Sequence, residues 1–160
     1  MKNKNIFVVF YVLINYFYTV SINITSGLSM FSNGKALVVD DNYLNQIVLK
    51  THLEKMGFSI DLASNGQEAL ELLNTNFYDV TLMDIQMPIM DGIECTRKIR
   101  LSDNKTLAAM PVIAVTANMD QYSDSLDTCD INGLVSKPVD VNMLTDMIKV
   151  CLSDNIENEN

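Results

Sequence analysis

The sequence has few basic residues and no cluster of them. Its 11 lysines and arginines are outnumbered by 20 aspartates and glutamates, and the formal net charge is −9. Proteins that bind nucleic acid directly gather lysines and arginines on one surface to contact the phosphate backbone. The composition therefore argues against direct nucleic-acid binding.

Cysteine and histidine are also scarce. Cys95, Cys129 and Cys151 are odd in number, widely spaced and embedded in apolar helical patterns, which fits neither a disulfide framework nor a zinc site. We interpret them as reduced thiols in the core. His52 is the single histidine. It stands in KTHLEKMG with no kinase motif nearby, and we interpret it as a partly exposed helical residue and not as a phosphodonor.

Charge is absent from one long stretch near the start of the chain. No residue between 6 and 24 is charged, and Lys2 and Lys4 precede this stretch. Its length matches a membrane span or a signal-peptide core, and the positive-inside rule would send the remainder of such a chain out of the cytoplasm. We divide the chain into an apolar leader and linker (1–33), a folded domain (34–152) and a disordered tail (153–160).

Short apolar runs alternate with helical patterns through the folded domain. The predicted strands are 36–39, 59–63, 80–83, 112–115 and 134–135. Such alternation indicates βαβ units around a parallel sheet, and hence an α/β doubly wound fold.

Helical periodicity separates these strands. The second helix is predicted to follow a cap at Asn65, with Phe77 ending its inward stripe, and the fifth runs to Leu152. The fourth, ending near Cys129, is rich in Ser, Asp and Thr, so we expect it to be marginally stable.

Charged or hydroxyl-bearing residues lie just after four of the predicted strands. They are Asp40 and Asp41, Asp84, Thr116 and Lys137. In a doubly wound fold the carboxyl ends of the strands meet at one edge, where ligands bind. Clustered carboxylates repel one another unless a cation joins them, and Mg²⁺ prefers oxygen ligands. An aspartate nucleophile with metal, ammonium and hydroxyl groups beside it suits phosphoryl transfer.

Other phosphate chemistries fit less well. VVDDNYLN, at the end of the first strand, lacks the glycine turn of dinucleotide-binding domains. A phosphohydrolase of the haloacid-dehalogenase type needs a second aspartate two residues beyond its nucleophile, and Gln86 occupies that place.

Four motifs resemble those of response-regulator receiver domains of two-component signalling and phosphorelays. They are LVVDDN (37–42), MDIQMPIMDG (83–92), VTAN (115–118) and SKP (136–138). The motif MDIQMPIMDG most resembles that of receivers attached to hybrid sensor kinases. The resemblance implies a (βα)5 flavodoxin-like three-layer sandwich with strand order 2-1-3-4-5.

The same resemblance implies roles for the strand-end residues. Asp84 would be the phosphoacceptor and a Mg²⁺ ligand. Asp41 would bind Mg²⁺ directly, Asp40 chiefly through water, and Gln86 through its backbone carbonyl.

Further roles are implied on the other side of the predicted pocket. Thr116 would donate its hydroxyl to the phosphoryl group and Lys137 would pair with it, with the Lys137-Pro138 peptide cis. Leu134 stands where the family usually has Tyr or Phe. We therefore expect an altered readout at the fifth strand.

The resemblance also implies partners. A histidine kinase or a histidine phosphotransfer protein would donate the phosphoryl group, and an effector would contact the fourth and fifth helices. The expected function is that of a single-domain response regulator, a switch with self-catalysed phosphorylation and dephosphorylation only, and not an enzyme. The alternative is a degenerate receiver that binds partners independently of phosphorylation.

A receiver needs a cytoplasmic phosphodonor, which conflicts with export by the leader. We therefore expect a cytoplasmic protein, with Met30 as an alternative start and membrane association through 6–24 as an open alternative.

Overall fold

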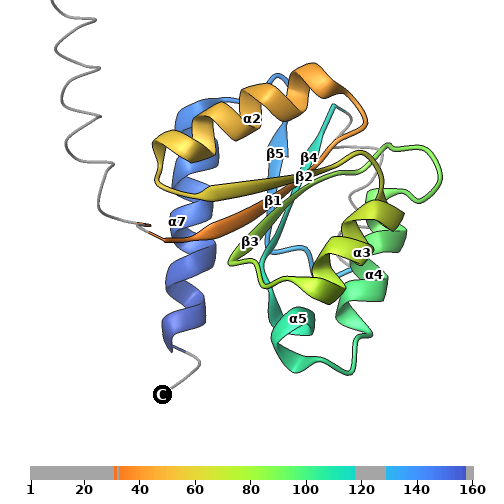
Figure 1. Cartoon of the computed structure of the whole chain (residues 1–160). Helices are drawn as coiled ribbons and strands as arrows, with labels where there is room; N and C mark the ends of the chain where they lie inside the picture. Colours follow the sequence, from red (N-terminus) through yellow and green to blue (C-terminus); the bar gives the residue numbers. More distant parts are fainter. Residues whose placement is uncertain (1–30, 32, 118–128, 158–160) are drawn as a thin grey trace, which may run out of the picture.

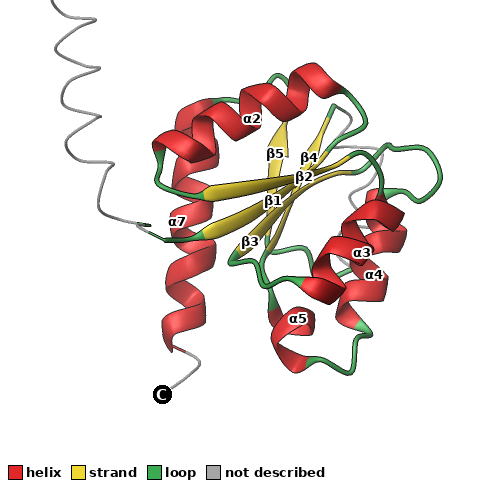
Figure 2. Ribbon diagram, viewed as in Figure 1, coloured by secondary structure: helices red, strands yellow, loops and turns green. Residues whose placement is uncertain are grey.

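The protein forms one parallel sheet between two layers of helices (Figures 1 and 2). The computed structural model describes residues 31, 33–117 and 129–157. Five parallel strands lie in the order β2-β1-β3-β4-β5. Their bounds are β1 (Lys35–Val39), β2 (Ser59–Ala63), β3 (Val80–Asp84), β4 (Val112–Thr116) and β5 (Gly133–Ser136). The predicted fold class and strand order are confirmed.

The helices cover both faces of the sheet. On one face lie α2 (Tyr43–Lys55) and α7 (Val141–Glu157), and on the other lie α3 (Gly66–Thr75), α4 (Gly92–Arg100) and α5 (Lys105–Ala109). Successive strand residues point to opposite faces. In β1, Ala36 and Val38 therefore pack under α2 and α7, while Leu37 and Val39 pack under α3 and α4. A strand covered on both faces reads as an unbroken apolar run.

Side-chain caps start three helices close to the ends of the strands. Asn42 accepts a hydrogen bond from the Leu44 amide, Asn65 from the Glu68 amide and Asp91 from the Glu94 amide. Each cap satisfies an amide that has no partner within its helix. The cap predicted at Asn65 is confirmed.

The inward position predicted for Phe77 is wrong. The helix α3 ends at Thr75, and Asn76 has an extended backbone (φ −135°, ψ 158°). The helical stripe therefore stops two residues before Phe77, whose side chain is 77% exposed. Tyr78 is buried instead, and its hydroxyl donates to Asp61 Oδ2 at 2.6 Å.

Two helical features depart from the sequence-based expectation. The short helix α5 was not predicted; Asn104 caps it, and Leu107 is its buried residue. The helix α7 continues to Glu157, so residues 153–157 are helical and not part of a disordered tail. At the start of this extension the Ser153 hydroxyl donates to the Lys149 carbonyl at 2.6 Å.

The core begins before the predicted domain boundary at 34. Phe31 stacks on Phe58 with ring centroids 5.0 Å apart, and it packs on the cluster under α2 and α7. The apolar stretch 6–24 and most of the predicted fourth helix lie outside the described residues. Within the residues that the structure describes, no helix is long and apolar enough to cross a membrane. The three cysteines are buried in the core, as predicted.

A histidine links the two helices on one face of the sheet. His52 on α2 is partly buried, and its Nε2 lies 3.0 Å from Thr145 Oγ1 on α7. Thr145 Oγ1 lies 2.7 Å from the Val141 carbonyl, to which it donates, so it accepts from the N–H of His52. Burial, with a smaller contribution from the charge of Lys55, lowers the pKa of His52.

This lowered pKa predicts a pH dependence of stability. Below about pH 6.5 the unfolded chain takes up a proton at His52 that the folded chain does not. The contribution of His52 to the free energy of unfolding is therefore present at pH 7.5 and declines as the pH falls toward 5.5. Urea unfolding at both pH values should show that His52→Gln removes this part of the pH dependence. An unchanged pH dependence in the variant would contradict the assignment.

Candidate functional site

Three carboxylates meet at the carboxyl edge of the sheet. Asp40 directly follows β1, Asp41 comes next, and Asp84 is the last residue of β3. Because β1 and β3 are neighbours with Val39 opposite Met83, their ends lie side by side. One carboxylate oxygen from each aspartate lies within 4.8 Å of the others. Asp40 is 1% and Asp84 6% exposed, whereas Asp41 is exposed to solvent.

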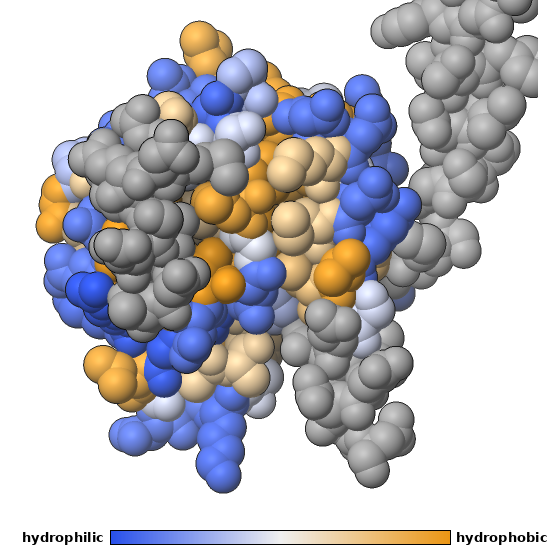
Figure 3. Space-filling model, turned by 180° about the vertical axis from the view of Figure 1, so that it is seen from behind, coloured by the Kyte–Doolittle hydropathy of each residue, from blue (hydrophilic) through white to orange (hydrophobic). Residues whose placement is uncertain are grey.

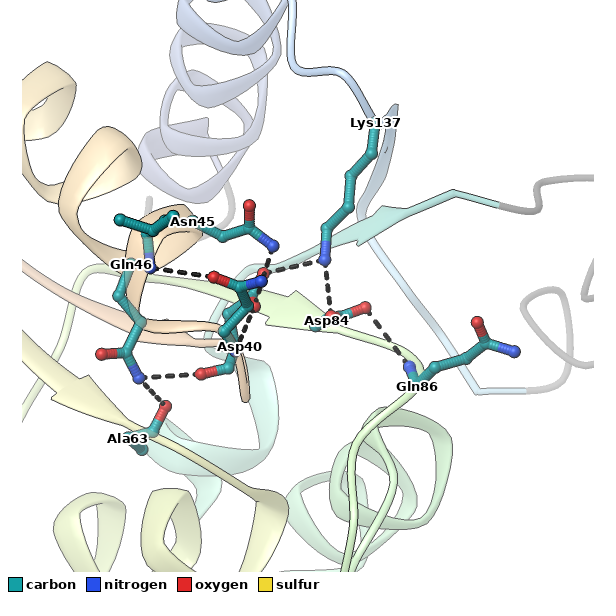
Figure 4. Close-up of polar contacts among 9 residues, drawn as sticks. Asp40, Asn45, Gln46, Ala63, Asp84, Gln86 and Lys137 are labelled. Carbon is teal, nitrogen blue, oxygen red and sulfur yellow. Dashed lines mark hydrogen bonds and ion pairs between the residues drawn. The ribbon is translucent and has the colours of Figure 1, made fainter.

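The ammonium group of Lys137, which follows the edge strand β5, forms ion pairs with two of these carboxylates (Figure 4). The Lys137 Nζ lies 2.8 Å from Asp40 Oδ2 and 2.5 Å from Asp84 Oδ2. Burial acts to lower the pKa of Lys137, but its bonds to Asp40 and Asp84 raise the value above that of an ordinary lysine. Lys137 is therefore a cation at neutral pH and offsets the repulsion between the two aspartates.

Burial dominates the ionisation of Asp84. It raises the pKa of Asp84 above its ordinary value, and the charge of Asp40 adds to this effect. The hydrogen bond and charge of Lys137 act in the opposite direction, as does the Gln86 amide, which donates to Asp84 Oδ1 at 3.3 Å. Asp84 is thus a buried carboxyl group whose ionised form is disfavoured by burial and stabilised by Lys137.

The loop after β3 brings α4 close to Asp84. A Cβ on Gly92 would overlap the Asp84 carbonyl oxygen, so only glycine fits. The Gly92 amide donates to the Ile85 carbonyl at 3.0 Å. In the same loop the side chain of Gln86 is exposed, beside a groove of about 440 Å³ that Asp41 and Met87 also line.

The ends of β4 and β5 complete the edge. Thr116 is buried at the end of β4, opposite Ser136, and its carbonyl accepts from the Lys137 amide at 2.8 Å. The Lys137-Pro138 peptide is cis, as expected. Leu134 is partly buried against a cluster that includes Ile85, Ile93 and Cys129. All the predicted site residues therefore lie at one edge, while their chemical roles stay predictions.

Two polar residues of this region were missed in the sequence. The Asn45 side-chain amide donates to Asp40 Oδ1 at 3.1 Å, and the Asn42 backbone amide donates to the same oxygen at 2.9 Å. Gln46 is 5% exposed and donates to the Asp40 carbonyl at 2.8 Å. The signal for Gln46 was available, since it lies on the inward stripe of α2 together with Leu49 and Leu53.

The donor set fits a hard divalent cation. Three carboxylates at one edge supply oxygen ligands, and cations such as Mg²⁺ take carboxylate, carbonyl and water oxygens. Both Asp40 oxygens already accept hydrogen bonds, whereas Asp41 is open to solvent. This arrangement is compatible with direct binding by Asp41 and indirect binding by Asp40.

Comparison with known proteins gives a consistent family assignment. The family model described as "Response regulator receiver domain" matches residues 36–149, which is more than half of the chain. Hybrid signal transduction histidine kinase I of Dictyostelium discoideum is 36% identical over 129 residues, covering 77% of this chain but 7% of that protein. Histidine kinase 5 of Arabidopsis thaliana is 32% identical, covering 74% of this chain and 16% of that protein. The chain thus matches only a small part of these relatives.

A solved structure has a similar fold. The receiver domain of the sensor histidine kinase PA1611 from Pseudomonas aeruginosa PAO1 is 29% identical, with a TM-score of 0.70. The match covers 76% of this chain and 99% of that one. In that structure a magnesium ion is coordinated in the active-site cleft.

The ion pairs of Lys137 predict a metal-dependent stability change. Lys137→Met leaves Asp40 and Asp84 without their cation, so the free energy of unfolding should fall by about 1–3 kcal/mol without metal. Added Mg²⁺ should recover part of this loss. Urea unfolding with and without Mg²⁺ measures both effects. Lys149→Met is the control, because it removes only an exposed pair with Asp146 at 3.6 Å, and such pairs contribute little. Equal stabilities of the Lys137 and Lys149 variants would refute this account.

Proposed function

Because the chain belongs to the response regulator receiver domain family, we propose that Asp84 accepts a phosphoryl group from a phosphohistidine donor. One observation carries this proposal. The buried Asp84 carboxylate lies against the Lys137 ammonium and within 4.8 Å of two further carboxylates. An ionised oxygen nucleophile with cationic groups beside it is the requirement for aspartyl phosphate formation.

The acidic residues would hold Mg²⁺. Asp41 and Asp84 would bind it directly, Asp40 chiefly through water, and Gln86 through its backbone carbonyl. When bound, Mg²⁺ would supply positive charge against the negative charge that develops on the transferred phosphoryl oxygens.

The remaining residues would act on the same oxygens. An Asp84 carboxylate oxygen forms the new bond to phosphorus while the bond from phosphorus to the donor imidazole breaks, and the imidazole keeps the electron pair. Lys137 exchanges its contact with Asp84 for one with the phosphoryl group. Thr116 donates its hydroxyl from the end of β4. Hydrolysis at the same phosphorus would return the domain to its starting state.

The domain would act as a switch and not as an enzyme with a free substrate. Phosphorylation would stabilise a conformation already accessible to the unmodified domain, and partner proteins would read that conformation. An effector could use α7, where Val141, Met143 and Val150 are exposed. On the rear face of the molecule, apolar surface is interspersed with polar surface (Figure 3). The part of the expected effector surface on the fourth helix lies outside the described residues.

Intact mass spectrometry tests the phosphoacceptor directly. The chain is incubated with acetyl phosphate and Mg²⁺, beside Asp84→Asn and a reaction with chelator. We expect one phosphoryl adduct on the wild type and none in either control. A folded wild-type chain that binds Mg²⁺ but gains no adduct would instead favour the degenerate receiver, a binding module independent of phosphorylation.

The phosphohistidine donor would dock on the first turns of α2. Leu44 and Val48 lie one helical turn apart and are 71% and 59% exposed. The helix that carries them begins at Tyr43, directly after Asn42. An amphipathic helix of the donor could pack its apolar face on this stripe. A histidine on that helix would then lie near the neighbouring carboxylates.

A charge placed on this stripe separates docking from chemistry. The test uses a histidine kinase that phosphorylates the wild type. Val48→Glu should slow phosphotransfer from this kinase by about tenfold or more, since each 1.4 kcal/mol of lost binding free energy changes the affinity tenfold. Labelling by acetyl phosphate should stay unchanged. Val150→Glu, the same substitution at an exposed valine of α7, serves as the control. Equal slowing with both phosphodonors would exclude a docking role.

A further inference from the structure

A buried amide on α2 lies directly behind the carboxylate cluster. Gln46 Nε2 donates to the Asp40 carbonyl at 2.8 Å and to the Ala63 carbonyl at 3.0 Å (Figure 4). It also lies 3.5 Å from Ser64 Oγ. The Ala63 carbonyl also accepts from the Asp40 amide at 3.1 Å. The ends of β1 and β2 are therefore tied through one side chain, and both backbone polar groups of Asp40 are fixed.

This tie determines the direction of the following residue. The peptide between Asp40 and Asp41 is planar, so fixing the Asp40 carbonyl also fixes the direction in which the Asp41 Cα leaves it. Asp41 is exposed to solvent, and packing does not hold its side chain. Its carboxylate therefore depends on the backbone for its position relative to Asp84.

Asn45 holds the side chain of Asp40 in place. Its amide donates to the Asp40 carboxylate itself, on the oxygen opposite the one that contacts Lys137. Asn45 thus orients the side chain of Asp40, whereas Gln46 orients the backbone from which Asp41 extends. The two neighbouring amides have separate tasks.

We propose that Gln46 is a positioning residue that makes the carboxylate cluster selective for Mg²⁺ over Ca²⁺. This inference rests on the proposed function of Asp40, Asp41 and Asp84 as the metal-binding residues. Mg²⁺ requires near-octahedral geometry with short bonds to oxygen, whereas Ca²⁺ accepts longer bonds and variable coordination. A site whose backbone is held rigidly can enforce the stricter geometry. A loosened site loses Mg²⁺ affinity first.

Titration calorimetry of the full chain with MgCl₂ and with CaCl₂ tests this. Gln46→Met keeps the length of the side chain and removes both donors. The Mg²⁺ Kd should rise by about 10 to 100-fold, as is usual when a group behind a metal ligand is lost. The Ca²⁺ Kd should rise by a clearly smaller factor. Gln67→Met is the matched control, because Gln67 is exposed and its side-chain amide donates to Glu71 of its own helix. Both Kd values of this variant should equal those of the wild type.

Each outcome has a defined meaning. Equal changes in both Kd values, or no change, would overturn the role of Gln46 while leaving the proposed function intact. A wild-type chain that binds no Mg²⁺ would overturn the proposed function itself. If Gln46→Met does not fold, Gln46→Asn replaces it, since its shorter amide keeps the donors but cannot reach both carbonyls. Ile148→Val, a mild core change in α7, shows whether lost stability alone changes the ratio of the two Kd values.

Discussion

The contact of one ammonium group with two buried carboxylates is the constraint on which the site depends. Asp40 and Asp84 come from neighbouring strands, and their burial would be unfavourable without a cation between them. That cation comes from β5, which is separated from β3 by β4. A residue after β5 must therefore reach across the end of β4, and the long side chain of Lys137 does so.

The close approach of loops and helices to the strand ends is the second constraint. The helix α4 begins against the end of β3 only because residue 92 is a glycine. Asn42 and Asp91 cap the helices that start on either side of the carboxylates. The connections at this edge are short, and their polar side chains form hydrogen bonds with the free backbone amides of the helix starts. Asp40, Asp41 and Asp84 are not used as caps of these helices.

The sequence predicts the sheet and its acidic edge because both depend on simple patterns. An apolar run followed by aspartate marks a buried parallel strand and its end, and this holds for β1 and β3 alike. Features that depend on local backbone turns were missed. Periodicity alone does not show that α3 stops before Phe77, and α5 is too short to have a period. The helical spacing of Gln46 with Leu49 and Leu53 indicates that it is buried, but the sequence does not show which backbone carbonyls its amide contacts, because these lie at the ends of β1 and β2.

The three carboxylates differ in how firmly each is held, and this difference matches the separate tasks proposed for them. Both oxygens of Asp40 accept hydrogen bonds, from Asn42 and Asn45 on one and Lys137 on the other. Asp41 is exposed and can exchange water for a metal ion. The pKa of Asp84 is raised by burial although Lys137 opposes this shift, so its ionised form is less stabilised than that of an exposed carboxylate. In the proposed function Asp84 is the nucleophile, and it is the carboxylate whose ionised form burial disfavours and Lys137 stabilises.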